Sequence, residues 1–155
     1  FRMYSGISLM PGARELVAHL QEHGVYVAIV SAGVDIFVSS IAALLKVDDW
    51  IANGFEFDDE DYLSDHGICR LHASGKGDII QRIIEMHGFE SKNVLSVGDS
   101  EMDLSMMIEG SHFIGFNPSR ESSIKAFEES SVPIIYDKDL MKILEYIELP
   151  SSEGN

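Results

Sequence analysis

The chain has 155 residues, enough for one domain with a single hydrophobic core. Hydrophobic residues make up 45% of the sequence and charged residues 24%, which is typical of a folded rather than a disordered chain. The formal net charge of −15 argues against a nucleic acid or an anionic membrane as partner, because both require a basic surface.

The first part of the chain predicts two helices on either side of a buried strand. Residues 11–24 have helical spacing, with Pro11 suited to the first turn and Gly24 as the stop. Residues 25–30, VYVAIV, form a continuous apolar run that is typical of a strand buried on both faces. Residues 35–45 then return to helical spacing.

The rest of the chain continues this alternation after an acidic hairpin. Residues 55–71 alternate around a glycine-containing acidic connection, which predicts an antiparallel hairpin. Further helices are expected at 76–88, 102–110, 119–129 and 139–147, and further strands at 93–97, 112–116 and 132–136. Strands that alternate with helices predict an α/β fold with a mainly parallel sheet. We expect one core domain over residues 1–149 and a flexible tail at 150–155.

Three features of the sequence bear on the compartment of the protein and on what precedes the chain. Its single cysteine, Cys69, cannot form an internal disulfide, and this predicts a protein of the reducing cytoplasm. No apolar run approaches the length of a membrane span, and no signal peptide is visible. Because residue 1 is Phe and not Met, we expect a segment upstream of it.

Polar residues follow the predicted strands where a parallel sheet binds its ligands, at the carboxyl ends. Ser31, Ala32 and Gly33 offer a hydroxyl and open backbone N–H groups, which can cradle an anion. The plain alternative is that Ser31 is only a cap or turn residue. Lys76 begins a predicted helix, where its charge opposes the helix dipole unless a negative group is near. It is either a fixed ammonium for a phosphate or a solvated loop lysine.

The stretch LSVGDSEMD, residues 95–103, places two carboxylates at the end of a predicted strand. Ser100 and Asp103 have the spacing of a capping box, so helix capping alone is one interpretation. The other is a Mg²⁺ site, because Mg²⁺ takes one or two carboxylates and leaves its other positions to water and phosphate. Asp99 would then be the direct ligand, and Asp103 would orient Lys76 or a metal-bound water.

Ser31, Lys76 and Asp99, in this order, resemble the haloacid dehalogenase-like phosphatase superfamily. Its second motif is a strand ending in Ser or Thr, its third is a lysine, and its fourth is a strand ending in GD…D. Four segments are similar to the phosphoserine-phosphatase-like branch: LMPGARELVAHLQEHGVYVAIVSAG, IANGFEFDD, GKGDII and VGDSEMD. The resemblance covers residues 9–147 and implies a Rossmann-like, three-layer α/β/α core, Mg²⁺ as cofactor and a small phosphorylated metabolite as substrate.

The resemblance fails at the first motif of the family. That motif, Asp-x-Asp, ends the first and central strand; one aspartate attacks phosphorus and the other is general acid and base. Residues 1–30 contain no aspartate. We therefore expect an upstream segment or a second chain to complete the sheet, because a missing central strand costs about the whole stability of a small domain. Asp137 and Asp139 have the right spacing, but their segment resembles the ordinary closing strand, turn and helix of the family.

The resemblance implies a Mg-dependent phosphomonoester hydrolase whose nucleophile lies upstream, so that this chain alone would be inactive. Its expected site has Lys76 and Asp103 as catalytic residues, Ser31, Ala32, Gly33 and Lys76 as phosphate ligands, and Asp99 as the metal ligand. The alternative is a degenerate, non-catalytic binding module of the same superfamily. The absent Asp-x-Asp favours this alternative, as does Met102, where the branch usually has Asn. The presence of Ser31, Lys76, Asp99 and Asp103 together argues against this alternative.

Overall fold

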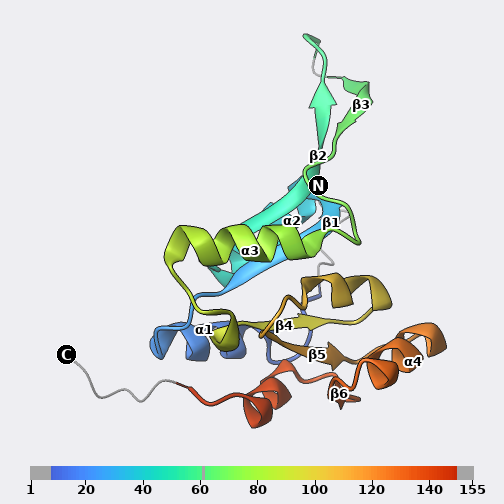
Figure 1. The fold of residues 1–155 in the computed structure, drawn as a ribbon. Coiled ribbons are helices and arrows are strands. Elements are labelled where there is room, and N and C mark those ends of the chain that lie inside the picture. The colour runs from blue at the N-terminus through green and yellow to red at the C-terminus, as the bar shows by residue number, and fades with distance from the viewer. Residues whose placement is uncertain (1–7, 61, 150–155) are drawn as a thin grey trace.

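The computed structural model describes residues 8–60 and 62–149, in which helices and strands alternate along the chain (Figure 1). The predicted tail at 150–155 lies outside the described residues. The α-helices are α1 (Ala13–Glu22), α2 (Asp35–Leu45), α3 (Lys76–His87) and α4 (Glu121–Glu129). The strands are β1 (Ala28–Val34), β2 (Asp49–Phe57), β3 (Leu63–Ile68), β4 (Leu95–Gly98), β5 (His112–Phe116) and β6 (Ile134–Ile135). Short 3₁₀ helices are η2 (Ser91–Asn93), η3 (Glu101–Met106) and η4 (Leu140–Tyr146).

The strands form two sheets, with the orders β1-β2-β3 and β4-β5-β6. The pairs β1/β2, β4/β5 and β5/β6 are parallel, and β2/β3 is antiparallel. The mainly parallel α/β architecture with a hairpin is therefore confirmed. Over the described part of the chain, β1 and β4 have no strand partner on their outer edges, so that each sheet ends in a free edge.

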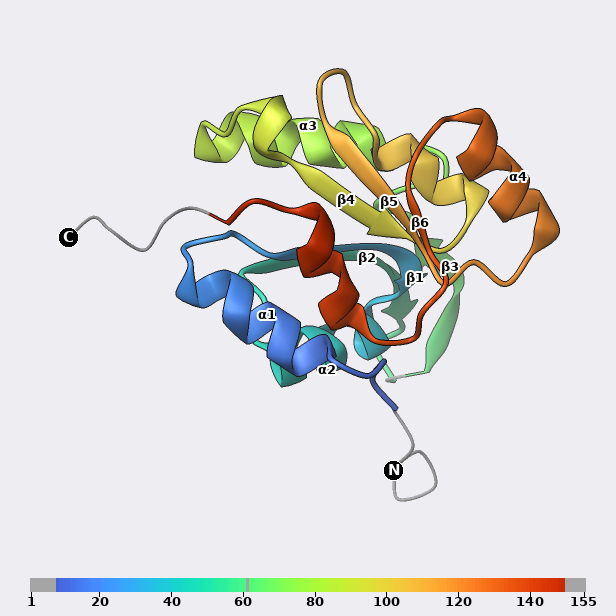
Figure 2. The ribbon, with the colours of Figure 1, turned by 90° about the horizontal axis from the view of Figure 1, so that it is seen from below.

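Two clusters of buried side chains lie on either side of β5. On one side, Ile114 and Phe116 pack with buried residues of α1, β6 and η4, namely Leu16, Ile135 and Ile143. On the other side, Phe113 packs with buried residues of α3, η3 and α4, namely Ile80, Ile84, Met106 and Phe127. Val30 of β1 contacts this second cluster. Helices thus cover both sides of the sheets, as the view from below shows (Figure 2).

The strand β1 is shifted relative to the predicted 25–30, because it begins at Ala28 and continues through Ser31, Ala32 and Gly33 to Val34. Its register with β2 shifts on the way: Val30 lies opposite Ile51, whereas Val34 lies opposite Asn53. Three residues of β1 therefore face a single residue of β2, which makes the Ser31–Gly33 segment a bulge. A bulge breaks the ladder of hydrogen bonds and re-aims the side chains of the bulged strand.

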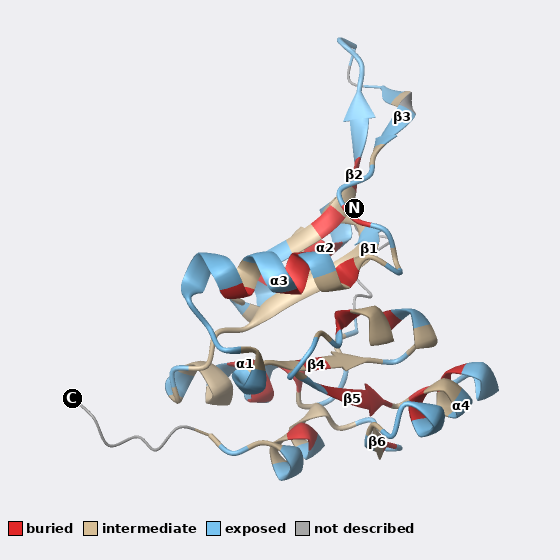
Figure 3. Cartoon of the chain, viewed as in Figure 1, coloured by how far each residue is buried: buried red, intermediate tan, exposed pale blue. Residues whose placement is uncertain are grey.

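β2, the first strand of the hairpin, also begins earlier than predicted. β2 starts at Asp49 and pairs in parallel with β1 before it turns into the hairpin with β3. The sequence prediction missed this first half, since parallel pairing joins segments that are distant in the chain. The hairpin tip projects from the body (Figure 1) and is mostly exposed (Figure 3), including Phe57 and Leu63, which lie opposite each other.

Two of the predicted helices differ in kind from what was expected, because 102–110 and 139–147 form the shorter 3₁₀ helices η3 and η4. Asp139 caps η4 by accepting a hydrogen bond from Met141 N at 3.0 Å, and Asp137 Oδ1 accepts one from Asp139 N at 2.8 Å. This Asp-x-Asp pair thus has a local capping role. No helix within the described ranges combines the length and apolar character needed to cross a bilayer.

The close packing of β5 against α4 makes a testable prediction at Gly115. A Cβ added there would lie 2.7 Å from Phe127 Cε2, in a fully buried site. We expect Gly115→Ala to lower the free energy of unfolding by about 1–3 kcal/mol through overpacking, measured by urea unfolding. Gly67→Ala is the control, because its added Cβ meets nothing nearer than 3.7 Å. Equal effects of the two substitutions would contradict this packing.

Candidate active site

Lys76 begins α3 and is buried, with 8% of its surface exposed. Its Nζ donates to Asp103 Oδ1 at 2.5 Å, which makes a buried ion pair between α3 and η3. The carboxylate supplies the negative group that a lysine at a helix N-terminus requires. The alternative of a solvated loop lysine is therefore wrong.

The second oxygen of Asp103 organises the turn after β4. Asp103 Oδ2 accepts hydrogen bonds from Asp99 N at 3.1 Å, Ser100 N at 3.2 Å and Ser100 Oγ at 3.1 Å. The capping box predicted from the sequence is formed, so that capping and charge pairing coexist in one side chain. Burial raises the pKa of Asp103, but the hydrogen bond and charge of Lys76 and the hydrogen bonds from Ser100 outweigh it and hold the pKa below its usual value.

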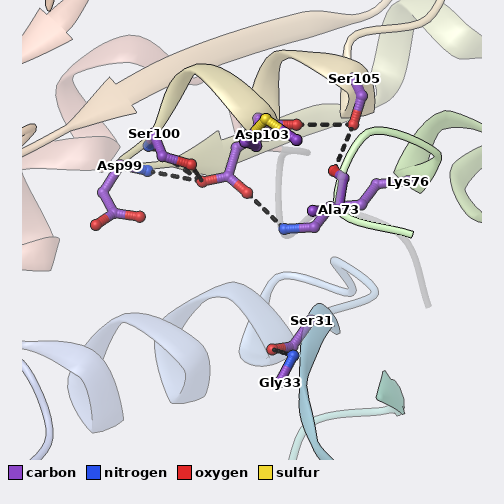
Figure 4. A network of polar contacts seen from close by, with 9 residues as sticks. Ser31, Gly33, Ala73, Lys76, Asp99, Ser100, Asp103 and Ser105 are labelled. Atoms are coloured by element: carbon purple, nitrogen blue, oxygen red, sulfur yellow. Dashed lines mark hydrogen bonds and ion pairs between the residues drawn. The ribbon is translucent and has the colours of Figure 1, made fainter. Parts of the chain in front are cut away.

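The side chain of Asp99 is left free by this arrangement. Asp99 is exposed, and no side chain in the described ranges is hydrogen-bonded or ion-paired to its carboxylate. Figure 4 shows this carboxylate and Lys76 Nζ on the side that faces β1, with Ser31 and Gly33 across from them. The sequence motifs from β1, α3 and the end of β4 are thus brought to one region between the two sheets.

The bulge of β1 holds the expected phosphate-binding residues in a half-exposed position. Gly33 N–H donates to Ser31 Oγ at 3.1 Å, so the Ser31 side chain bonds to its own backbone two residues further on, within the bulge. The Ser31 O–H can still rotate to donate to a ligand. Ala32 is fixed through its carbonyl, which accepts from Asn53 Nδ2 at 3.1 Å.

Two glycines allow the close approach of α3, β4 and η3 around the ion pair. A Cβ at Gly98 would lie 2.7 Å from Asp103 Oδ2, and one at Gly77 would lie 2.6 Å from the carbonyl oxygen of Ser105. Ser105 Oγ also donates to the carbonyl of Ala73 at 3.2 Å, which connects η3 to the loop before Lys76 (Figure 4). Both glycines are therefore required by packing around Lys76 and Asp103.

Sequence analysis missed Glu101, which connects η3 to the first turn of α4. Its carboxylate accepts hydrogen bonds from Ser123 Oγ and, at 3.3 Å, from Ser122 Oγ. The bond from Ser123 is the main reason why the pKa of Glu101 lies below its usual value. The signal in the sequence was the pair of serines early in a predicted helix, where hydroxyl groups commonly bond to nearby chain.

The described residues can supply one protein ligand to a Mg²⁺ ion. The described residues contain no group of three or more His, Cys, Asp or Glu side chains able to hold a metal. Asp103 is engaged by Lys76 and Ser100, which leaves Asp99 as the available hard oxygen ligand. This donor set suits a cation that also binds water and phosphate, and not a cage made by this chain alone.

The buried ion pair predicts a large effect of Asp103→Asn. The substitution leaves the Lys76 ammonium buried without a counter-charge, and we expect a loss of about 3–5 kcal/mol in the free energy of unfolding. Urea unfolding at neutral pH measures it, with the exposed Asp59→Asn of the hairpin as control. A loss equal to that of the control would show that the ion pair contributes nothing to the free energy of unfolding.

The same pair predicts a pH dependence. Because folding lowers the pKa of Asp103, its contribution is present above the unfolded value of about 3.9. The contribution is lost as the pH falls through the lower folded value. We expect Asp103→Asn to flatten the stability profile in this acidic window, measured by thermal unfolding between neutral and acidic pH. An unchanged profile would contradict the assigned ion pair.

The haloacid dehalogenase-like hydrolase family matches residues 2–107 of the chain. The phosphoserine phosphatase of Methanocaldococcus jannaschii is 31% identical over 136 residues, which cover 88% of this chain and 62% of that protein. The phosphoserine phosphatase of Archaeoglobus fulgidus is 34% identical over 116 residues, which cover 75% of this chain and 34% of that protein. The chain thus spans less than two thirds of the length of these curated relatives.

Solved structures agree with this relationship. A phospho-aspartyl intermediate analogue of phosphoserine phosphatase superimposes with a TM-score of 0.79 and 30% identity, over 91% of this chain and 65% of the other. An apo phosphoserine phosphatase gives a TM-score of 0.79 and 30% identity, over 91% of this chain and 68% of the other. The Rossmann-like core expected from the resemblance is therefore confirmed. The chain belongs to the haloacid dehalogenase-like hydrolase family, in its phosphoserine-phosphatase-like branch.

Proposed function

We propose that residues 1–149 form the core of a magnesium-dependent phosphomonoester hydrolase of the phosphoserine-phosphatase type. The observation that carries this proposal is the buried Lys76, held by Asp103 and facing the Ser31 bulge (Figure 4). A fixed ammonium and a hydroxyl can bind phosphoryl oxygens. Together with a divalent cation they offset the net charge of −15, which otherwise repels an anionic substrate.

Each side chain has a distinct role in this proposal. Lys76 Nζ contacts a phosphoryl oxygen, and Asp103 keeps the ammonium in place. In this proposal Ser31 donates a hydrogen bond from its hydroxyl group to another phosphoryl oxygen. The N–H groups of Ala32 and Gly33 would bind the same phosphoryl group, the Gly33 N–H in exchange for its bond to Ser31 Oγ. Asp99 would hold Mg²⁺, which neutralises charge on the phosphoryl group when it is bound. The ligand is a small phosphorylated metabolite.

The nucleophile of the proposed reaction is an aspartate from outside this chain. Its carboxylate attacks phosphorus and expels the alcohol of the ester, and water then hydrolyses the aspartyl-phosphate. We propose that the strand bearing it, from an upstream segment or a second chain, inserts between β1 and β4. In the described ranges both strands have a free edge, and Val30 of β1 already packs against the buried cluster that contains Phe113 of the other sheet.

The compartment and the activity of the isolated chain also belong to this proposal. With Cys69 as the single cysteine, the reducing cytoplasm is the compartment we propose. The chain without its added strand would bind phosphate weakly and would not turn over an ester, because it lacks the attacking group.

A non-catalytic phosphate-binding module is the second candidate. Met102 favours it, since this exposed side chain offers no polar group where the branch usually has Asn. The buried Lys76–Asp103 pair weighs against it, because a charged pair is costly to keep in a fold that no longer binds an anion. Phosphate binding without ester hydrolysis in the full-length gene product would identify the module.

Asp99→Asn tests the proposed metal ligand. The substitution removes a charge and a hard oxygen ligand, and we expect Mg-dependent phosphomonoesterase activity of the full-length gene product to fall about 100-fold or more. Phosphate release at several Mg²⁺ concentrations measures it, with Asp59→Asn as the matched control on the hairpin. Wild-type activity in Asp99→Asn, or activity without Mg²⁺ dependence, would refute the assignment.

Amide hydrogen exchange tests the inserted strand. In the full-length gene product, N–H groups on the free edges of β1 and β4 should exchange about tenfold or more slowly than in residues 1–155 alone. The inner strand β5 is the internal control, since it already pairs on both sides. Equal exchange at the edges of β1 and β4 in both proteins would mean that no strand inserts there.

A further inference from the structure

The side chain of Asn53 joins the bulge of β1 to the chain that leads to Lys76. Asn53 Nδ2 donates to the carbonyl of Ala32 at 3.1 Å and to that of Leu71 at 3.0 Å. Asn53 Oδ1 accepts from Arg70 N at 2.8 Å and from Leu71 N at 3.0 Å. A primary amide has two donor hydrogens and two acceptor lone pairs, so that all four are used.

This network also fixes the orientation of the amide group. The two carbonyl oxygens require the NH₂ group and the two backbone N–H groups require the oxygen, so a flipped amide would lose all four bonds. An aspartate at this position would place an oxygen against the carbonyls of Ala32 and Leu71. Only an amide of this length satisfies both sides, and this explains a half-buried Asn53 in the middle of β2, between Ala52 and Gly54.

The network lies where the backbone ladder is interrupted. Asn53 is the residue opposite Val34, just past the bulge of Ser31–Gly33. A bulged segment loses regular cross-strand bonds, and the bond from Asn53 to Ala32 replaces one of them. On the other side, the buried Leu71 lies in the short loop between β3 and Lys76. Asn53 thus fixes both segments to the same point of β2.

Arg70 makes a second set of contacts, which joins β2 to the start of α2. Arg70 Nη1 donates to the carbonyl of Ala52 at 2.8 Å and to Asp35 Oδ2 at 3.0 Å, at the first residue of α2. A Cβ at Gly54 would lie 2.5 Å from Asp35 Oδ2 and 2.8 Å from Arg70 Nη1, so glycine leaves room for this pair. The start of α2, the bulge and the lysine loop are therefore connected through β2.

We propose that Asn53 is a positioning residue for the candidate site, an inference that rests on the proposed phosphatase function. All four hydrogen-bonding positions of the Asn53 amide are taken by backbone groups, which leaves none for a substrate. It sets the separation between the Ser31–Gly33 bulge and Lys76, and hence the geometry with which the two hold a phosphoryl group. Small errors in such separations are known to cost large factors in binding and rate.

The test measures orthophosphate affinity, in the presence of Mg²⁺, for variants of the full-length gene product. Asn53→Leu removes all four bonds without adding charge, and Asn53→Asp removes only the two donated to carbonyls. Asn93→Asp makes the same chemical change on the distant η2 turn. Gly115→Ala destabilises the core without touching the site, and so separates lost stability from lost positioning.

We expect both Asn53 variants to bind orthophosphate about tenfold or more weakly, while Asn93→Asp and Gly115→Ala bind like the wild type. In the wild type, the side-chain amide hydrogens of Asn53 should exchange far more slowly than those of Asn93. Wild-type affinity in Asn53→Leu, or an effect confined to the charged Asn53→Asp, would overturn the inference.

Hydrogen exchange separates failure of this inference from failure of the proposed function. If the wild type binds no orthophosphate with Mg²⁺, the proposed function fails. The inference is then tested by the rate at which the N–H groups of Gly33 and Leu71 exchange in Asn53→Leu. Faster exchange there than in Gly115→Ala would support the positioning role, and equal exchange would overturn it.

Discussion

A lysine buried at the start of a helix needs a counter-charge, and the arrangement of the candidate site depends on this constraint. Asp103 supplies the charge with one oxygen and binds the turn after β4 with the other. Because the turn is held through its backbone N–H groups, the Asp99 side chain is free for a ligand. Gly77 and Gly98 are needed because any larger residue would hold the helix and the turn apart. One ion pair thus connects sequence, packing and proposed chemistry.

The site lies between two sheets, and this explains why its residues come from distant parts of the chain. Ser31 belongs to the free-edged strand β1, and Asp99 follows the free-edged strand β4 (Figure 4). The two halves are joined by packing of Val30 on the cluster around Phe113. An added strand at this position would pair with both free edges. It would also bring a third set of side chains to the region that Ser31, Lys76 and Asp99 face.

The sequence predicted what depends on local pattern and missed what depends on distant partners. The alternation of apolar strands and amphipathic helices predicted the α/β architecture. The polar residues after the strands, together with the resemblance, predicted Lys76, Asp99 and Asp103 as site residues, and the structure brings these three together. The first half of β2 was missed because its pairing with β1 is non-local. The bulge at Ser31–Gly33 was missed, and the strand was expected to end at residue 30, because the register with β2 is not visible in the local sequence.

The role of Asn53 could not be predicted for the same reason. Its hydrogen-bond partners lie 17 to 21 residues away along the chain, and a single asparagine in WIANGF has no periodic signal. The 3₁₀ character of η3 was also missed, since the same residues carry the apolar spacing of a short α-helix. In each case the tertiary contacts of the folded chain decide the conformation.

A crystal structure of the full-length gene product with Mg²⁺ and orthophosphate would test the central claim most directly. The account predicts a strand hydrogen-bonded to both β1 and β4, Mg²⁺ on Asp99, and a phosphate in contact with Ser31 and Lys76. A direct β1–β4 pairing, or a phosphate bound away from Lys76, would contradict it.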